Sequence, residues 1–170
     1  MIIRDPKKIL NFLNGIGVDF KNRSVDDFLE CSDEEIEKCH DRIQYAFPLH
    51  EESDHAHTYP VITPQIAEMV KKDSEAINNL KKLTDRMKKF YAIGEYYDKD
   101  RQRKWCKPSD HNLLRITRII RSLRLFGLEK EAKDFYVHAS MAADMFLPNN
   151  SITVKYWEKA LARPIWETLK

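Results

Sequence analysis

The chain has 170 residues, enough for one domain with a sizeable core, and its hydrophobic fraction of 42% fits a folded globular protein. Its 33% charged residues and only four glycines favour helices, and no apolar run is long enough to span a bilayer. The opening segment is too charged for a secretory signal. We therefore expect a soluble, intracellular protein without a membrane partner, in the cytoplasm or, if the source is viral, in the host cytoplasm.

Charge is distributed unevenly along the chain, although the net charge is only +2. Residues 24–57 hold eleven Asp and Glu against two cations, whereas residues 101–127 hold eight Lys and Arg against one acid. Two interpretations stay open. The acidic and basic halves neutralise each other, or the basic part faces an anionic partner.

The first elements are short helices with clear start signals. A helix is predicted at 6–14 with Pro6 in its first turn, and another at 24–30 with Ser24 as its N-cap. Pro48 is expected to end the helical segment that follows.

That segment, residues 31–47, is predicted to form one helix in which Ser32 and Glu35 make a capping box. One face combines five residues at helical spacing: Ile36, Cys39, His40, Ile43 and Phe47. A histidine on such a face is more often a satisfied core residue than a binding residue. The alternative is that His40 and Gln44 line a pocket.

Residues 48–62 are predicted to form a long loop, after which Thr63 and Pro64 start a new helix. Two helical segments are expected from 64 to about 92, with a break near residues 73–74. Long loops in compact domains are often functional or disordered, and a solvated loop is the default expectation here.

A polar, basic connection at 96–110 is expected to lead into a helix at 111–127. Ser109 is the predicted N-cap of that helix and Gly127 its C′ residue. Two further helices complete the chain, at 129–146 and 151–163. Because no repeat, linker or alternating strand pattern is visible, we predict one compact all-α domain over residues 1–170, with about six to eight helices.

The helix at 111–127 is unusual because it carries four arginines beside an apolar face. On a helical wheel, six residues form an ordinary core face: Leu113, Ile116, Ile119, Ile120, Leu123 and Phe126. A narrow group, here called the polar stripe, contains His111, Arg115, Arg118 and Ser122. Leu114 and Leu125 flank the polar stripe, whereas Arg121 and Arg124 lie on the remaining side and are predicted to be solvated.

Apolar flanks predict that Arg115 and Arg118 are mostly buried and that each contacts a carboxylate or a bound anion, because a buried unpaired charge is costly. One alternative is an internal network with Asp41, Glu37 or Glu51. The other is a pocket for an anionic ligand, which arginine binds in a bidentate manner.

Two segments carry a recognisable combination of residues. In "CHDRIQYAFPLHE" at 39–51 the matching residues are His40, Ile43, Gln44, Tyr45, Phe47 and Pro48. In "HNLLRITRIIRSLRLFGLE" at 111–129 they are His111, Asn112, Leu114, Arg115, Ile116, Thr117, Arg118 and Ile119. The aromatic segment "FYAIGEYYD" at 90–98 and Trp105 lie between them.

In order and spacing, these segments resemble the conserved region of the opioid growth factor receptor family over residues 36–140. The resemblance implies a helical domain and pairs the segment of His40 with the arginine helix. Tyr45 and Ala46 stand where the family has Trp and Leu, and the receptor's long repeat-bearing tail is absent. The chain therefore looks like a compact single-domain member of microbial or viral type, and the family's opioid-peptide role implies a peptide or protein interaction module.

The residues favour a non-catalytic helical binding protein with a pocket for a small anionic ligand. The ligand is expected to resemble a nucleotide signal, which a phage protein could sequester as an anti-defence measure. The predicted site comprises His40, Gln44, His111, Asn112, Arg115 and Arg118. A peptide or protein interaction module is the alternative. A nucleotide-processing enzyme comes third, because Asp110 and His111 could support acid–base work but no nucleophile signature is present.

Other chemistry is expected to be absent or secondary. The histidines and acids of the loop at 50–57 lack the usual zinc-ligand spacing, so we predict no zinc there and no cofactor. The three cysteines have no CxxC spacing and are predicted to be reduced, mostly buried thiols. The basic segment 101–107, with Tyr96, Tyr97 and Trp105, could contact single-stranded nucleic acid, although the balanced overall charge makes this a lesser alternative.

Overall fold

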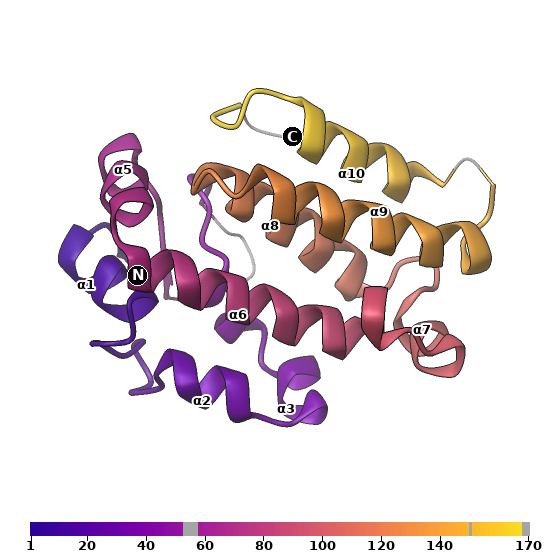
Figure 1. Cartoon of the computed structure of the whole chain (residues 1–170), viewed down its shortest axis with the longest axis horizontal. Coiled ribbons are helices and arrows are strands. Elements are labelled where there is room, and N and C mark those ends of the chain that lie inside the picture. The colour runs from indigo at the N-terminus through magenta and orange to yellow at the C-terminus, as the bar shows by residue number, and fades with distance from the viewer. Residues whose placement is uncertain (53–57, 150, 168–170) are drawn as a thin grey trace. The chain divides into compact units, whose positions relative to one another are not determined.

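A computed structural model describes residues 1–52, 58–149 and 151–167 (Figure 1). Ten α-helices lie in this part of the chain, eight of them with seven residues or more, and the sheet found there has two strands. The prediction of an all-α fold is confirmed. The chain divides into two compact units: unit 1 is Met1–Leu83 with Leu125–Gly127, and unit 2 is Thr84–Arg124 with Leu128–Lys170. That residues 1–170 form one domain stays a prediction.

Unit 1 contains the N-terminal helices and the sheet. Its helices are α1 (Pro6–Leu13), α2 (Val25–Glu30), α3 (Asp33–Lys38), α4 (His40–Ala46), α5 (Pro64–Lys72) and the first part of α6 (Ser74–Tyr91). Strands β1 (Ile2–Ile3) and β2 (Tyr59–Pro60) pair in parallel, with Ile2 opposite Tyr59. The segment predicted as a long loop therefore contributes β2 and, through Leu49 and Val61, a further bridge beside the sheet.

The helix starts of unit 1 follow local side-chain signals in the sequence. Ser24 and Ser32 each form a complete capping box with the acidic residue three positions later. Thr63 caps α5 ahead of Pro64, as predicted. The side chain of Asp73 accepts a hydrogen bond from the backbone N–H of Ala76 at 2.9 Å, and the predicted break before α6 is confirmed.

The prediction of one helix over 31–47 is wrong. Cys39 adopts φ −99° and ψ 85°, which is not helical, so α3 ends before it and α4 begins after it. The two helices have different surroundings. α3 buries Ile36 alone, whereas α4 buries four consecutive residues, 43–46, and is therefore enclosed on several sides. A single straight amphipathic helix could not satisfy both environments.

Unit 2 begins inside α6 and contains the remaining helices. These are the 3₁₀ helix η1 (Gly94–Tyr96), α7 (Lys99–Trp105), α8 (His111–Leu125), α9 (Glu129–Phe146) and α10 (Ile152–Ala162). α9 and α10 lie side by side (Figure 1). The indole Nε1 of Trp157 on α10 donates to the carbonyl of Leu113 on α8 at 3.0 Å, which ties these two helices together.

The polar connection predicted at 96–110 is wrong for much of its length, because it contains the end of η1 and the whole of α7. Asp98 caps α7 by accepting from the backbone N–H of Arg101 at 3.0 Å. The inner face of α7 consists of Gln102 and Trp105, both buried and three positions apart. A buried face of one amide and one indole gives only a weak apolar pattern. The periodicity of this charged segment therefore does not predict a helix.

For α8, the predicted N-cap is wrong and the predicted C-terminal end is confirmed. Ser109 is not the N-cap, because it adopts a positive φ of 65° and Asp110 takes the capping role instead. Gly127 adopts φ 76°, as expected for a C′ residue. The backbone N–H of Leu128 donates to the carbonyl of Leu123 at 2.9 Å, and Leu128 is buried, which completes the helix-terminating motif.

Candidate functional site

α8 carries four of the six residues predicted to form the site, and they begin at its first residue. The Asp110 carboxylate accepts from the backbone N–H of Asn112 at 2.9 Å and so caps the helix. Nδ1 of His111 lies 3.9 Å from Oδ1 of Asp110, which is too far for a hydrogen bond. The side chain of His111 is 40% exposed and can be reached from solvent.

Asn112 is the centre of a buried polar network in unit 2. Its side chain is almost fully buried, and its Oδ1 accepts from the hydroxyl of Tyr91 at 3.2 Å and from Nη1 of Arg115 at 3.3 Å. Tyr91 in turn packs edge-on against Trp105, with 5.0 Å between the ring centroids. The network therefore connects the arginine helix to the aromatic core.

Arg115 is buried, with 6% of its surface exposed, and Arg118 is half-buried. Burial of Arg115 confirms that part of the prediction. Its hydrogen bond to Asn112 uses a neutral acceptor, so that bond directs the guanidinium without neutralising its charge. The predicted contact of each arginine with a carboxylate or a bound anion stays a prediction.

The flanks of the polar stripe differ from one another. Leu125 and Ser122 are fully buried, whereas Leu114 is 68% exposed, so the apolar flank on that side faces solvent. Within the polar stripe itself, Arg115 and Ser122 are buried, whereas His111 and Arg118 are partly exposed.

The prediction that Arg121 and Arg124 are solvated is wrong. Arg121 is buried, and its Nη2 donates to the carbonyl of Glu167 at 2.8 Å. Nη1 of Arg124 donates to the carbonyls of Ala160 and Arg163, at 2.9 and 2.7 Å. The last carbonyls of a helix lack partners within it, and Arg124 supplies such partners at the end of α10, whereas Arg121 bonds a carbonyl in the segment after it. A wheel of α8 alone cannot reveal where another helix ends.

The remaining predicted site residues lie on α4 in unit 1. His40 is the first residue of α4 and is exposed, so its interpretation as a core histidine is wrong. Gln44 is buried, with 6% of its surface exposed. The break at Cys39 accounts for the exposure of His40, because it ends the continuous face on which the sequence placed it. That these two residues share a site with those of α8 stays a prediction.

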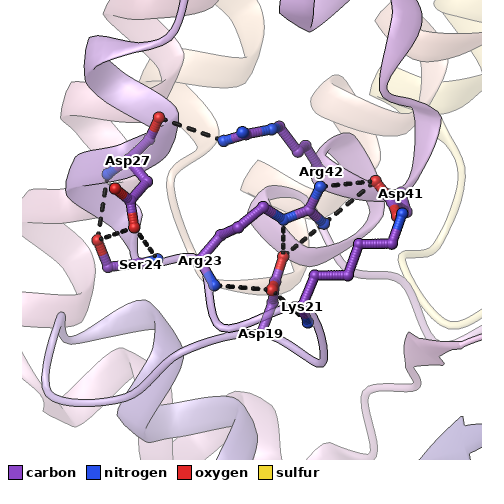
Figure 2. A network of polar contacts seen from close by, with 7 residues as sticks. All are labelled: Asp19, Lys21, Arg23, Ser24, Asp27, Asp41 and Arg42. Carbon is purple, nitrogen blue, oxygen red and sulfur yellow. Dashed lines mark hydrogen bonds and ion pairs between the residues drawn. The ribbon is translucent and has the colours of Figure 1, made fainter.

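Unit 1 contains a network of charged side chains around Arg23 (Figure 2). Nε of Arg23 donates to Asp19 at 2.7 Å, and its Nη1 donates to Asp41 at 3.1 Å. Nζ of Lys21 lies 2.6 Å from Oδ2 of Asp41. Asp19 also accepts from the backbone N–H groups of Lys21 and Arg23, so the network fixes the loop before α2 onto α4.

Asp41, which the sequence suggested as an internal partner for the arginines of α8, belongs to this network. Burial alone would raise the pKa of Asp41, but the hydrogen bond from Lys21 and the charge of Arg23 outweigh it, and the pKa is lowered from 3.8. Asp41 thus already has two cationic partners within unit 1.

Most of the aromatic residues expected to stack on single-stranded nucleic acid form hydrogen bonds within the protein. Trp105 is buried and its Nε1 donates to the carbonyl of Tyr91 at 2.9 Å. The hydroxyl of Tyr96 donates to Asp85 at 2.8 Å. Tyr97 is 59% exposed and is the ring of the three that could stack on a base from solvent.

The cysteines, all within the described ranges, form no disulfide, and Cys31 and Cys106 are buried. Burial raises the pKa of the Cys106 thiol to about 12, so it is not a nucleophile at neutral pH. In the described parts of the chain, no group of three His, Cys, Asp or Glu side chains could hold a metal ion. The prediction of a zinc-free loop at 50–57 involves residues 53–57, which lie outside the described residues.

Across residues 1–52, 58–149 and 151–167, no helix has both the length and the apolar character needed to cross a bilayer.

In a comparison with protein families, the chain matches the opioid growth factor receptor conserved region over residues 6–163. That match contains all six predicted site residues and extends beyond the segment that carries the sequence resemblance. Comparisons with curated proteins and with solved structures gave no match.

Proposed function

The chain belongs to the family of the opioid growth factor receptor conserved region, and we propose that it is a non-catalytic binding domain that holds a small anionic ligand on the polar stripe of α8. One observation carries the proposal. The buried guanidinium of Arg115 is directed by a hydrogen bond to the neutral amide of Asn112, which the hydroxyl of Tyr91 also holds. A cation oriented in this way before binding loses little conformational freedom when an anion arrives.

The spacing along α8 supports recognition of a phosphate or carboxylate group. Arg115 and Arg118 are three residues apart, which places their Cβ atoms about 5–6 Å from one another on one helical face. Guanidinium groups bind such anions through paired N–H donors, and these bonds strengthen where water is excluded. His111 lies one turn before Arg115 on the same stripe, and its side chain is 40% exposed.

Binding without turnover fits the surroundings of His111 better than catalysis. Asp110, its neighbour, caps α8 and is not hydrogen-bonded to the imidazole. Catalysis would also need a nucleophile, and the sequence contains no nucleophile signature. We therefore propose that the ligand leaves unchanged. Sequestration of a nucleotide signal, used against host defence if the source is a phage, is the specific form that we put forward.

Heat denaturation followed by mass spectrometry of the released supernatant tests this function. We expect a small anion to be released, because a Kd of about 1 nM corresponds to about 12 kcal/mol and survives purification. Arg118→Gln should abolish its recovery, whereas Lys130→Gln, an exposed lysine on α9, should retain it. Recovery of a chemically altered ligand after long incubation, dependent on His111, would favour an enzyme instead.

A peptide or protein interaction is the second candidate function, and a surface of α9 favours it. Val137, Met141 and Met145 recur every four residues and are 42%, 61% and 46% exposed. Exposed methionines suit adaptable contacts with a partner chain. If no small molecule is released and no nucleotide raises the melting temperature, this second function replaces the first.

A further inference from the structure

A second group of cations gathers where α10 ends, outside the polar stripe. There a shallow surface depression is lined in part by Arg121, Arg124, Lys159 and Arg163. We propose that this depression binds the terminal phosphate of a small molecule, such as a phosphate monoester or a diphosphate. The inference does not depend on the function proposed for the polar stripe.

Two of the four cations are fixed before any ligand arrives. Arg121 is 7% exposed and is held by the carbonyl of Glu167. Arg124 is held through Nε by Glu129 and through Nη1 by two carbonyls at the end of α10. Among the described residues no partner takes Nη2 of Arg124. A guanidinium with its position set and a donor remaining is preorganised for an oxyanion.

The other two cations lie at the rim and can move. Lys159 and Arg163 are exposed and four residues apart at the end of α10, where like charges repel one another. Within the described ranges neither forms an ion pair with a carboxylate, and Nζ of Lys159 lies 5.4 Å from the centroid of the Tyr156 ring. A bound anion would relieve the repulsion between the two rim cations.

Charge indicates the class of ligand. The four cations face two nearby acids, Glu129 and Glu167, which leaves a local excess of two positive charges (four minus two). That excess matches a terminal phosphate, which carries close to two negative charges at neutral pH. The phosphate group would lie over the four cations, with the rest of the ligand in solvent.

Calorimetric titration of the full chain with inorganic pyrophosphate tests the inference. We expect wild type to bind, and Lys159→Gln and Arg163→Gln each to bind about tenfold more weakly or worse, since a charged hydrogen bond is lost. Lys155→Gln is the matched control, because it removes the same charge from an exposed position of α10 outside the lining. Absence of binding, or equal losses in all three variants, would overturn the proposal.

Two further titrations distinguish this site from the polar stripe and identify the kind of phosphate that it binds. Arg118→Gln should still bind pyrophosphate at this site, and a complete loss of pyrophosphate binding in that variant would assign the binding to the polar stripe and overturn this inference. Adenosine 5′-monophosphate should compete with pyrophosphate, whereas the 3′,5′-cyclic diester, which has no terminal phosphate, should not. Equal competition by both would contradict recognition of a terminal phosphate.

Discussion

Arg23 shows how one half-buried residue can determine the arrangement of several others. Its guanidinium joins Asp19, which is buried, to Asp41 on α4 (Figure 2). Burying a charge is costly, so the arrangement is stable only while all its partners remain charged. The local sequence contains the acids and the cations, but it does not show that residues 23 and 41, eighteen positions apart, meet.

The pH dependence of stability follows from Asp41. Its pKa is depressed in the folded protein relative to the ordinary value of 3.8. Its contribution is therefore present above about pH 4 and is lost as the pH falls through the folded pKa. We expect the urea midpoint of wild type to fall more steeply from about pH 5 to about pH 3 than that of Asp41→Asn. Asp26→Asn, an exposed aspartate of α2, is the control, and equal slopes for both variants would refute the assignment.

At the scale of elements, the sequence predicts what is decided locally. α2 and α3 have six residues each and are too short to be stable alone, yet their capping boxes predict where they begin. The break at Cys39 has no proline or glycine to mark it in residues 31–47, and α7 depends on contacts outside its own segment. α7 depends on Gln102 and Trp105, whose side chains donate to carbonyls ten and fourteen residues earlier.

Gly127 allows a test of how α8 ends. Its φ of 76° is unfavourable for a residue with a Cβ, while an added Cβ would lie 3.8 Å from Cε of Lys71, an ordinary contact. Gly127→Ala should therefore lower the free energy of unfolding by about 1 kcal/mol through backbone strain alone. Gly127→Asn should lose less, because asparagine tolerates this conformation. Urea denaturation measures both, and an equal loss in the two variants would indicate crowding instead.

At the scale of the whole molecule, helical periodicity predicted the class of fold and most helix positions, and the family resemblance lies inside the matched range. The same periodicity placed Arg115 correctly in a buried position. It failed for Arg121 and Arg124, because their partners are carbonyls at the end of α10 and in the segment after it, about forty residues further along the chain. Patterns within one helix show which side is buried but not which backbone groups of another helix need donors.

The prediction of one domain over residues 1–170 can be tested by cooperativity. All three tryptophans, Trp105, Trp157 and Trp166, lie in unit 2, whereas Arg23 lies in unit 1. Helix α6 runs without a break from Ser74 to Tyr91, and so belongs to both units. Unfolding one unit alone would disrupt its backbone hydrogen bonds, and we therefore expect a single transition.

Arg23→Ala removes the cation between Asp19 and Asp41 and should cost about 3 kcal/mol. If the chain is one cooperative domain, tryptophan fluorescence and far-ultraviolet circular dichroism should shift together, to a lower urea concentration and by the same free energy. Lys21→Ala, whose side chain is 53% exposed, should cost less than about 1 kcal/mol and serves as the control. In Arg23→Ala, the fluorescence transition could stay at the wild-type urea concentration while the dichroism is lost at a lower one. Unit 1 would then unfold separately, and the single-domain prediction would be wrong.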